Sequence, residues 1–268
     1  MNNIKNMATL ILGGLVFLPS VSYADSGFIP RASLAISDYS FVQAERPNVL
    51  NPATAGGITE FPEVSFDVTF NMLGVGGTFY HDKYYVDLSA QHSDKQSDKF
   101  VFGAFEESLK GDRQDYAITF GMKPLDALSV YVGYKVGISE AAGNQGTKLK
   151  FTEDGYFVGA NYSWPVYSGT ITVNLAVAQL DGKFEETAAP ATLGFSAIGA
   201  LDLDADSKAT GLSYGITWSA PLTERLVYAL SLDVNNYTFD EVRDDVVNPP
   251  DEFEEEFTTA RMTLSYYF

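Results

Sequence analysis

Large apolar residues alternate with small or polar ones along most of the chain. Residues 128 to 139 show this best, with Leu, Val, Val, Tyr, Val and Ile at the even positions and Ser, Tyr, Gly, Lys, Gly and Ser at the odd positions. Successive side chains of a β-strand point to opposite faces, so this pattern predicts a strand with one apolar face and one small or polar face. We therefore expect an all-β protein.

The same alternation predicts ten strands. They lie at about residues 30–42, 63–80, 84–94, 114–123, 128–139, 154–164, 169–181, 206–219, 225–238 and 256–268. Three glycines between Asn71 and Gly77 leave room for a bulge or an additional turn, so eight or twelve strands are alternatives.

The predicted connections alternate between short and long. Short turns are expected at residues 81–83, 124–127, 165–168 and 220–224, and long polar connections at 43–62, 95–112, 140–153, 182–205 and 239–255. An even number of strands with short turns at one end and long loops at the other is typical of transmembrane β-barrels.

A soluble β-sandwich would also contain many alternating strands. A barrel is favoured because the predicted strands, about 10 to 13 residues long, match a tilted membrane crossing. Aromatic residues such as Trp164, Trp218 and Tyr266 gather at strand ends, where a membrane interface would place them. The second face is rich in Gly, Ala, Ser and Thr, which suits a narrow lumen. The predicted fold is a closed antiparallel up-and-down barrel of about ten strands.

The first residues predict a secretory signal peptide. Lys5 supplies a positive charge, an apolar run follows from Met7 to Leu18, and Ser22 and Ala24 are small residues placed for cleavage. The run is shorter than the roughly 20 apolar residues that a spanning helix needs. We expect a signal peptide at 1–24 and one barrel domain at 25–268.

The composition and charge of the chain exclude several kinds of site and argue against one class of partner. The chain has no cysteine, which excludes disulfides, zinc–thiolate sites and a cysteine nucleophile. Its formal net charge is -18, which argues against nucleic acid as a partner because phosphate binding needs clustered Lys and Arg.

The segment from Ala260 to Phe268 alternates and ends on Phe, and in this it resembles the terminal strand of Gram-negative outer-membrane barrels. The resemblance implies an outer-membrane location with both termini in the periplasm. It also implies surrounding outer-membrane lipid and lipopolysaccharide, and recognition of Tyr266 and Phe268 by the barrel-assembly machinery.

Ten strands would match the omptin proteases, whose active site needs an aspartate pair and an Asp–His pair in the upper barrel. This chain has two histidines. His81 falls in a short turn, at the end of the barrel opposite to the one that holds the omptin active site. His92 falls at a strand position whose side chain is expected to point out of the barrel. We therefore do not expect an omptin site.

Charged residues on the small, polar parity are candidates for lining the lumen. They are Asp67, Asp87, Asp115, Lys123, Lys135, Asp233 and Arg261, accompanied by Asn71, Asn161 and Asn174. Both signs of charge are present, so these groups form either a plug of ion pairs or the wall of a water-filled constriction. Inward small residues such as Gly121, Gly133 and Gly211 leave volume unfilled, which favours a narrow water path.

Other chemical signals are weak. His92 and Ser93 point to opposite faces of a strand, so they do not form a hydrolase pair. The acidic run at residues 202–206 lacks the Gly and Glu of a calcium-binding EF-hand loop. The last long connection, residues 239–255, is acidic, which suits a solvated loop or divalent-cation bridging to lipopolysaccharide phosphates. We expect no catalytic residues, no metal site and no cofactor.

The leading hypothesis is a non-enzymatic outer-membrane barrel that serves as a narrow passive channel for small solutes or as a structural surface protein. The alternatives are an adhesin or receptor that works through its long loops, and an outer-membrane enzyme acting on lipid or peptide.

Overall fold

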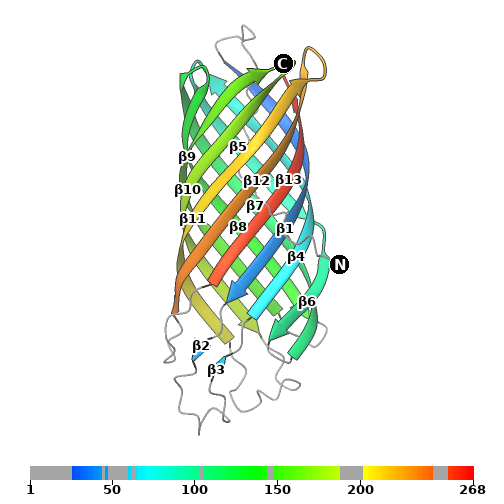
Figure 1. Cartoon of the computed structure of the whole chain (residues 1–268), viewed down its shortest axis with the longest axis vertical. Coiled ribbons are helices and arrows are strands. Elements are labelled where there is room, and N and C mark those ends of the chain that lie inside the picture. Colours follow the sequence, from blue (N-terminus) through cyan, green and yellow to red (C-terminus); the bar gives the residue numbers. More distant parts are fainter. Residues whose placement is uncertain are drawn as a thin grey trace.

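A computed structural model of the chain describes residues 26–43, 46–47, 60–61, 64–102, 105–143, 148–187, 202–243 and 253–268. They form a tall barrel of tilted strands (Figure 1). Among these residues, no helix is long and apolar enough to cross a membrane. The predicted signal peptide, residues 1–24, lies outside the described residues.

The described residues contain thirteen strands. They are β1 (Ser26–Gln43), β2 (Arg46–Pro47), β3 (Glu60–Phe61), β4 (Val64–His81), β5 (Tyr84–Ser93), β6 (Gln96–Phe102), β7 (Phe105–Leu125), β8 (Leu128–Gly143), β9 (Lys148–Val166), β10 (Gly169–Thr187), β11 (Asp202–Pro221), β12 (Leu226–Arg243) and β13 (Phe253–Tyr266).

Ten strand positions form the wall of the barrel. β1 pairs with β13 on one side and with β4 on the other, which closes the sheet, and neighbouring strands are antiparallel. β5 and β6 share one position, because only Asp94 and Lys95 separate them and both pair with β7. β2 and β3 form a separate ribbon. The predicted ten-stranded barrel is confirmed, and residues 71–77 are continuous strand without an additional turn.

The two ends of the barrel differ. Short turns join β4 to β5, β7 to β8, β9 to β10 and β11 to β12 at what we name the turn end, as predicted. The opposite end, at the bottom of Figure 1, is the loop end. The strands extend further toward the loop end than predicted: β7 has 21 residues and β9 has 19. Residues 105–112 and 148–153, which were expected in long connections, are strand.

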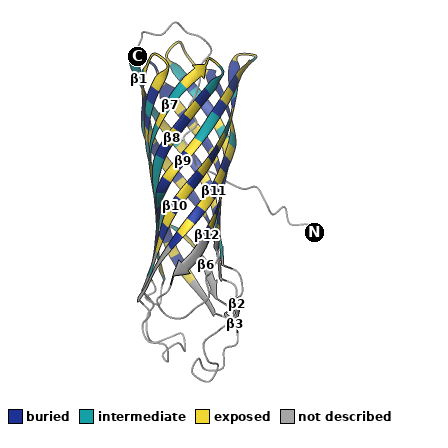
Figure 2. Ribbon diagram, turned by 90° about the vertical axis from the view of Figure 1, so that its left-hand side faces the viewer, coloured by how far each residue is buried: buried dark blue, intermediate teal, exposed yellow. Residues whose placement is uncertain are grey.

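Near the turn end, the barrel is apolar outside and polar or small inside. Figure 2 shows exposed and buried residues alternating along the strands. A continuous exposed apolar belt of this size is stable only against another apolar phase, so it marks the lipid-facing band. The exposed belt includes Leu34, Ile36, Leu73, Val75, Leu88, Phe120, Val132, Val158, Leu175, Val177, Ile216, Leu230, Leu232, Met262 and Leu264.

Toward the loop end, the two faces exchange character. On β12, the outward residues change from Leu230 and Leu232 to Asn236 and Thr238, while Tyr237 on the inner face is buried. β4 shows the same exchange: outward Leu73 and Val75 give way to Asp67, Thr69 and Asn71, and the inner face there carries Val68, Phe70 and Met72. The loop-end part of the barrel therefore has the pattern of a water-soluble barrel.

Aromatic residues mark both edges of the apolar band. On β9, Tyr156 lies at one edge and Trp164 at the other, and both are exposed on the outer face. These eight residues rise about 20 Å along the axis at ~3.3 Å per residue and ~40° tilt, close to the ~25 Å apolar band of such barrels. Beyond the band, β9 continues for another eight residues toward the loop end, from Tyr156 to Lys148. We name the whole region of the barrel between the band and the loop end the projecting half.

A charge on the outer face of β12 tests this boundary. Leu230→Arg places a charge near the middle of the lipid-facing band and is expected to lower the free energy of unfolding by about 2–4 kcal/mol. Thr238→Arg makes the same charge on the same face in water, with an expected change within about 0.5 kcal/mol. Urea unfolding in phospholipid vesicles measures both, and equal losses would show that the boundary is misplaced.

Candidate functional site in the barrel interior

The interior holds most of the charged residues predicted to line it. Asp87, Asp233 and Arg261 are buried on the inner face, and Asp115 and Lys135 line an interior cavity. The amides of Asn161 and Asn174 also lie on this face, on the neighbouring strands β9 and β10.

Two predicted lumen residues lie elsewhere. Asp67 and Asn71 are exposed on the outer face of the projecting half, so their placement in the lumen was wrong. The prediction assumed that the apolar side chains point outward along the whole strand. On β4 they point inward beyond the membrane band.

A third predicted lumen residue, Lys123, is exposed near the turn end of β7, at the rim and not in the central lumen.

The central feature is an ion cluster of Arg113, Asp115, Lys135 and Glu153. Arg113 donates from Nη2 to Glu153 Oε1 at 2.6 Å and from Nε to Asp115 Oδ1 at 3.0 Å. Lys135 Nζ donates to the same Glu153 oxygen at 2.9 Å. Arg113 and Glu153 are almost completely buried. Isolated charges removed from water cost several kcal/mol each, so this alternation of signs is what makes their burial tolerable.

Contacts from the ion cluster cross the lumen. Lys135 on β8 donates to the Tyr237 hydroxyl on β12 at 3.0 Å. The guanidinium of Arg113 on β7 lies 4.2 Å from the ring centroid of Phe257 on β13. These strands are not neighbours in the sheet. The side chains therefore meet across the barrel axis and fill its cross-section at this level.

An apolar layer covers the ion cluster on the loop side. Phe151 and Phe239, from β9 and β12, meet edge to face with ring centroids 5.3 Å apart. Tyr39 packs against Phe257 at 4.9 Å and donates from its hydroxyl to Glu255 Oε1 at 2.6 Å. Glu255 is buried, so it is not part of the solvated acidic connection predicted at 239–255. The layer consists of Tyr39, Phe70, Leu109, Phe151, Leu180, Phe239 and Phe257.

A second polar group lies nearer the turn end. Arg31 forms a two-pronged ion pair with Asp87, with Nη2 2.6 Å from Oδ1, and Thr78 donates to Asp87 Oδ2 at 2.6 Å. Gly76 on the adjacent strand is required here: a Cβ at this position would lie 2.5 Å from the Leu88 carbonyl oxygen and 3.0 Å from the Arg31 guanidinium.

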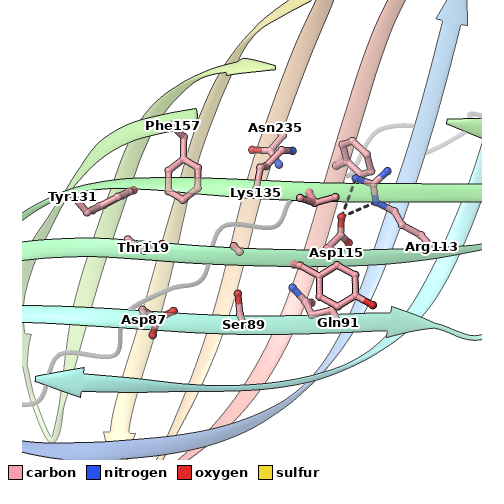
Figure 3. A pocket seen from close by; sticks show the side chains of 14 residues that line it. Asp87, Ser89, Gln91, Arg113, Asp115, Thr119, Tyr131, Lys135, Phe157 and Asn235 are labelled. Carbon is pink, nitrogen blue, oxygen red and sulfur yellow. Dashed lines mark hydrogen bonds and ion pairs between the residues drawn. The ribbon is translucent and has the colours of Figure 1, made fainter. Parts of the chain in front are cut away.

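Between these polar groups the lumen contains open space. One cavity is bordered by Asp87, Gln91, Arg113 and Lys135 together with the Tyr131 and Phe157 rings (Figure 3). A second, smaller cavity shares Ser89 and Gln91 with it.

The inward glycines do not leave unfilled volume as predicted. A Cβ on Gly121 would lie 2.0 Å from the Tyr85 ring, and one on Gly211 would lie 2.0 Å from the Tyr237 ring. Aromatic side chains of the neighbouring strands therefore lie flat over these positions.

The candidate chemical sites remain separate. His92 is exposed on the outer face, whereas Ser93 is buried inside and accepts a hydrogen bond from the backbone N–H of Arg113 at 2.7 Å. No cluster of three His, Cys, Asp or Glu suited to a metal occurs in the described part of the chain. The side chains of residues 202–206 lie outside the described residues, and their backbone belongs to β11.

Sequence reasoning missed Arg113, Glu153 and Glu255. Residues 140–153 and 239–255 were assigned to long connections, and Arg113 fell between a predicted connection and a predicted strand. The pattern that could have found Arg113 is the alternation that continues through Leu109, Gly111 and Arg113, whose side chains all lie on the inner face of β7.

Glu153→Gln tests the ion cluster. The change keeps the shape of the side chain but leaves Arg113 and Lys135 with one carboxylate fewer. We expect the free energy of unfolding in vesicles to fall by about 3–5 kcal/mol, as when one partner of a buried ion pair is removed. Glu185→Gln, which breaks the exposed Lys183–Glu185 pair, is the matched control and is expected to cost less than about 1 kcal/mol. A loss at Glu153 as small as that at Glu185 would contradict the role of the cluster.

Comparison with known proteins identifies the fold. No protein-family model and no curated protein sequence matches the chain. Among solved structures, the outer-membrane protease OmpT from Escherichia coli is similar, with a TM-score of 0.57 and 12% identity over 93% of this chain and 99% of that chain. The translocator domain of the autotransporter NalP from Neisseria meningitidis aligns with a TM-score of 0.42 and 12% identity, over 89% of this chain and 88% of that chain. The likeness to OmpT shows that the chain has the fold of the outer-membrane β-barrels that its last strand resembles.

Proposed function

We propose that this outer-membrane β-barrel is a non-enzymatic surface protein whose lumen is closed at rest. The observation that carries this proposal is the pair of stacked layers inside the projecting half. In the first layer, contacts with Tyr237 and Phe257 join the ion cluster to the opposite wall of the barrel. In the second, the apolar layer on the loop side, Phe239 and Leu180 are each 0% exposed. A solute would have to separate both layers to pass.

In this proposal the turn end faces the periplasm and the loop end faces outward. The apolar interior then makes the projecting half a rigid stalk that holds the external connections about 20 Å above the lipid surface. Tyr266 and Phe268, which are exposed at the turn end, are expected to be recognised by the barrel-assembly machinery. The surrounding partners are outer-membrane lipid and lipopolysaccharide.

A narrow passive channel for small solutes is the second candidate. It is favoured by the two cavities, which extend from the ion cluster toward the turn end and whose walls include charged and hydroxyl side chains. The two candidates differ in whether the layers of the projecting half open.

Single-channel recording in planar bilayers separates these candidates. We expect the refolded wild-type barrel, verified by its heat-modifiable gel mobility, to give no discrete conductance steps. A variant that combines Arg113→Ser, Glu153→Ser and Phe239→Ala removes parts of both layers and is expected to conduct if its gel mobility shows a folded barrel. Regular steps from the wild type would overturn the closed lumen and establish the channel.

The acidic external segment is expected to bind lipopolysaccharide through divalent cations. Residues 244–252 include four carboxylates, which can share Mg²⁺ with lipid phosphates. Replacing this segment by a Gly-Ser linker is expected to preserve the folded barrel and remove Mg²⁺-dependent binding to lipopolysaccharide micelles. The same replacement of residues 188–201, which contain no charged residue, is the control and should retain binding. Equal binding by both variants would exclude this role for the acidic segment.

A further inference from the structure

Arg261 is a buried cation that makes no direct ion pair with a carboxylate among the described residues. Its side chain lies on the inner face of β13 and is 7% exposed. Nη2 donates to the Gln91 amide oxygen at 3.2 Å, and Nε has no hydrogen-bond partner. The buried carboxylate of Asp233 on β12 interacts with Arg261 at longer range, whereas Arg31 is in direct contact with Asp87. A charge buried in this way needs a compensating charge or solvent.

The smaller cavity lies directly against this side chain. Its wall contains two guanidiniums, from Arg31 and Arg261, and no carboxylate. Hydroxyl groups supply most of the remaining polar wall, from Ser33, Ser89, Thr217, Ser231 and Thr263.

Thr217 supplies a second unsatisfied group in the same wall. Its Oγ1 atom is buried and has no hydrogen-bond partner. Thr217 pairs with Ser231, and Ser231 pairs with Arg261, so the three residues follow one another across β11, β12 and β13. Two buried atoms without hydrogen-bond partners, Arg261 Nε and Thr217 Oγ1, therefore belong to side chains that border one cavity.

We propose that this cavity binds a small inorganic oxyanion, such as phosphate or sulfate. Such an ion presents several acceptor oxygens to a wall made of guanidinium and hydroxyl donors, and its negative charge lies against two cations. Water would satisfy the hydroxyls but would not give the arginine guanidinium an ionic contact. The low dielectric of the enclosed wall strengthens an ionic contact relative to the same contact in water.

Phosphate retention tests the proposal. The full barrel is refolded in non-ionic detergent and brought to equilibrium by dialysis against increasing concentrations of radiolabelled phosphate at constant ionic strength in NaCl, and bound phosphate is the excess label on the protein side. We expect saturable binding of about one phosphate per barrel, competed by sulfate. Absence of saturable binding, or binding unaffected by the variants below, would overturn the site and indicate water in the cavity.

The variants separate binding from folding. Arg261→Met is expected to weaken phosphate binding about tenfold to hundredfold, because it removes a charge-assisted donor. Thr217→Val, which keeps the side-chain volume, is expected to weaken it about two- to tenfold and keeps the test valid if the Arg261 variant does not fold. Thr170→Val is the matched control: its hydroxyl is also buried and unpartnered, but Thr170 does not line the cavity, so binding should be unchanged.

Discussion

The fold depends on a change of solvent along the outer wall of the barrel. Near the turn end the wall faces lipid, so the outward side chains are apolar and the inward ones are small or polar. Beyond the aromatic edge at Tyr156 the wall is surrounded by water, and the same strands place Asn236 and Thr238 outside and Tyr237 inside. Apolar and polar residues alternate along the strands in both regions. The apolar residues lie on the outer face in the lipid band and on the inner face in the projecting half.

This reversal determines what each part of the lumen can do. Within the band, the polar inner face leaves space and exposes groups such as Arg31 and Arg261 to the cavities. In the projecting half, the apolar residues inside pack as they would in a soluble barrel and close the cross-section. The ion cluster lies in the projecting half, next to the band, where Glu153 pairs with Arg113 and Lys135 on the turn side of the apolar layer. Its charges are tolerated because each is paired, which also fixes the positions of the strands that carry them.

The sequence was sufficient to predict the ten strands of the wall within the membrane band, although not their extension toward the loop end, because period-two alternation is independent of which face is apolar. It also placed Asp87, Asp233 and Arg261 correctly inside, since these residues lie where the apolar parity faces lipid. It failed at Asp67, where the parity had reversed. It also failed at Glu153, where acidic and polar residues outside the membrane resemble a loop. Cross-lumen partners such as Lys135 and Tyr237 depend on the closure and register of ten strands, which no local pattern specifies.

The apolar band ends and the projecting half begins between Leu232 and Asn236 on β12. Site-directed spin labelling of β12 tests this boundary directly. Nitroxides placed one at a time at Leu230, Leu232, Val234, Asn236 and Thr238 in vesicles would be measured for relaxation by oxygen, which partitions into lipid, and by a water-soluble nickel chelate. We expect oxygen-dominated relaxation at residues 230 and 232 and chelate-dominated relaxation at 236 and 238. Oxygen-dominated relaxation continuing to residue 238 would place the projecting half in the membrane and contradict the assigned boundary.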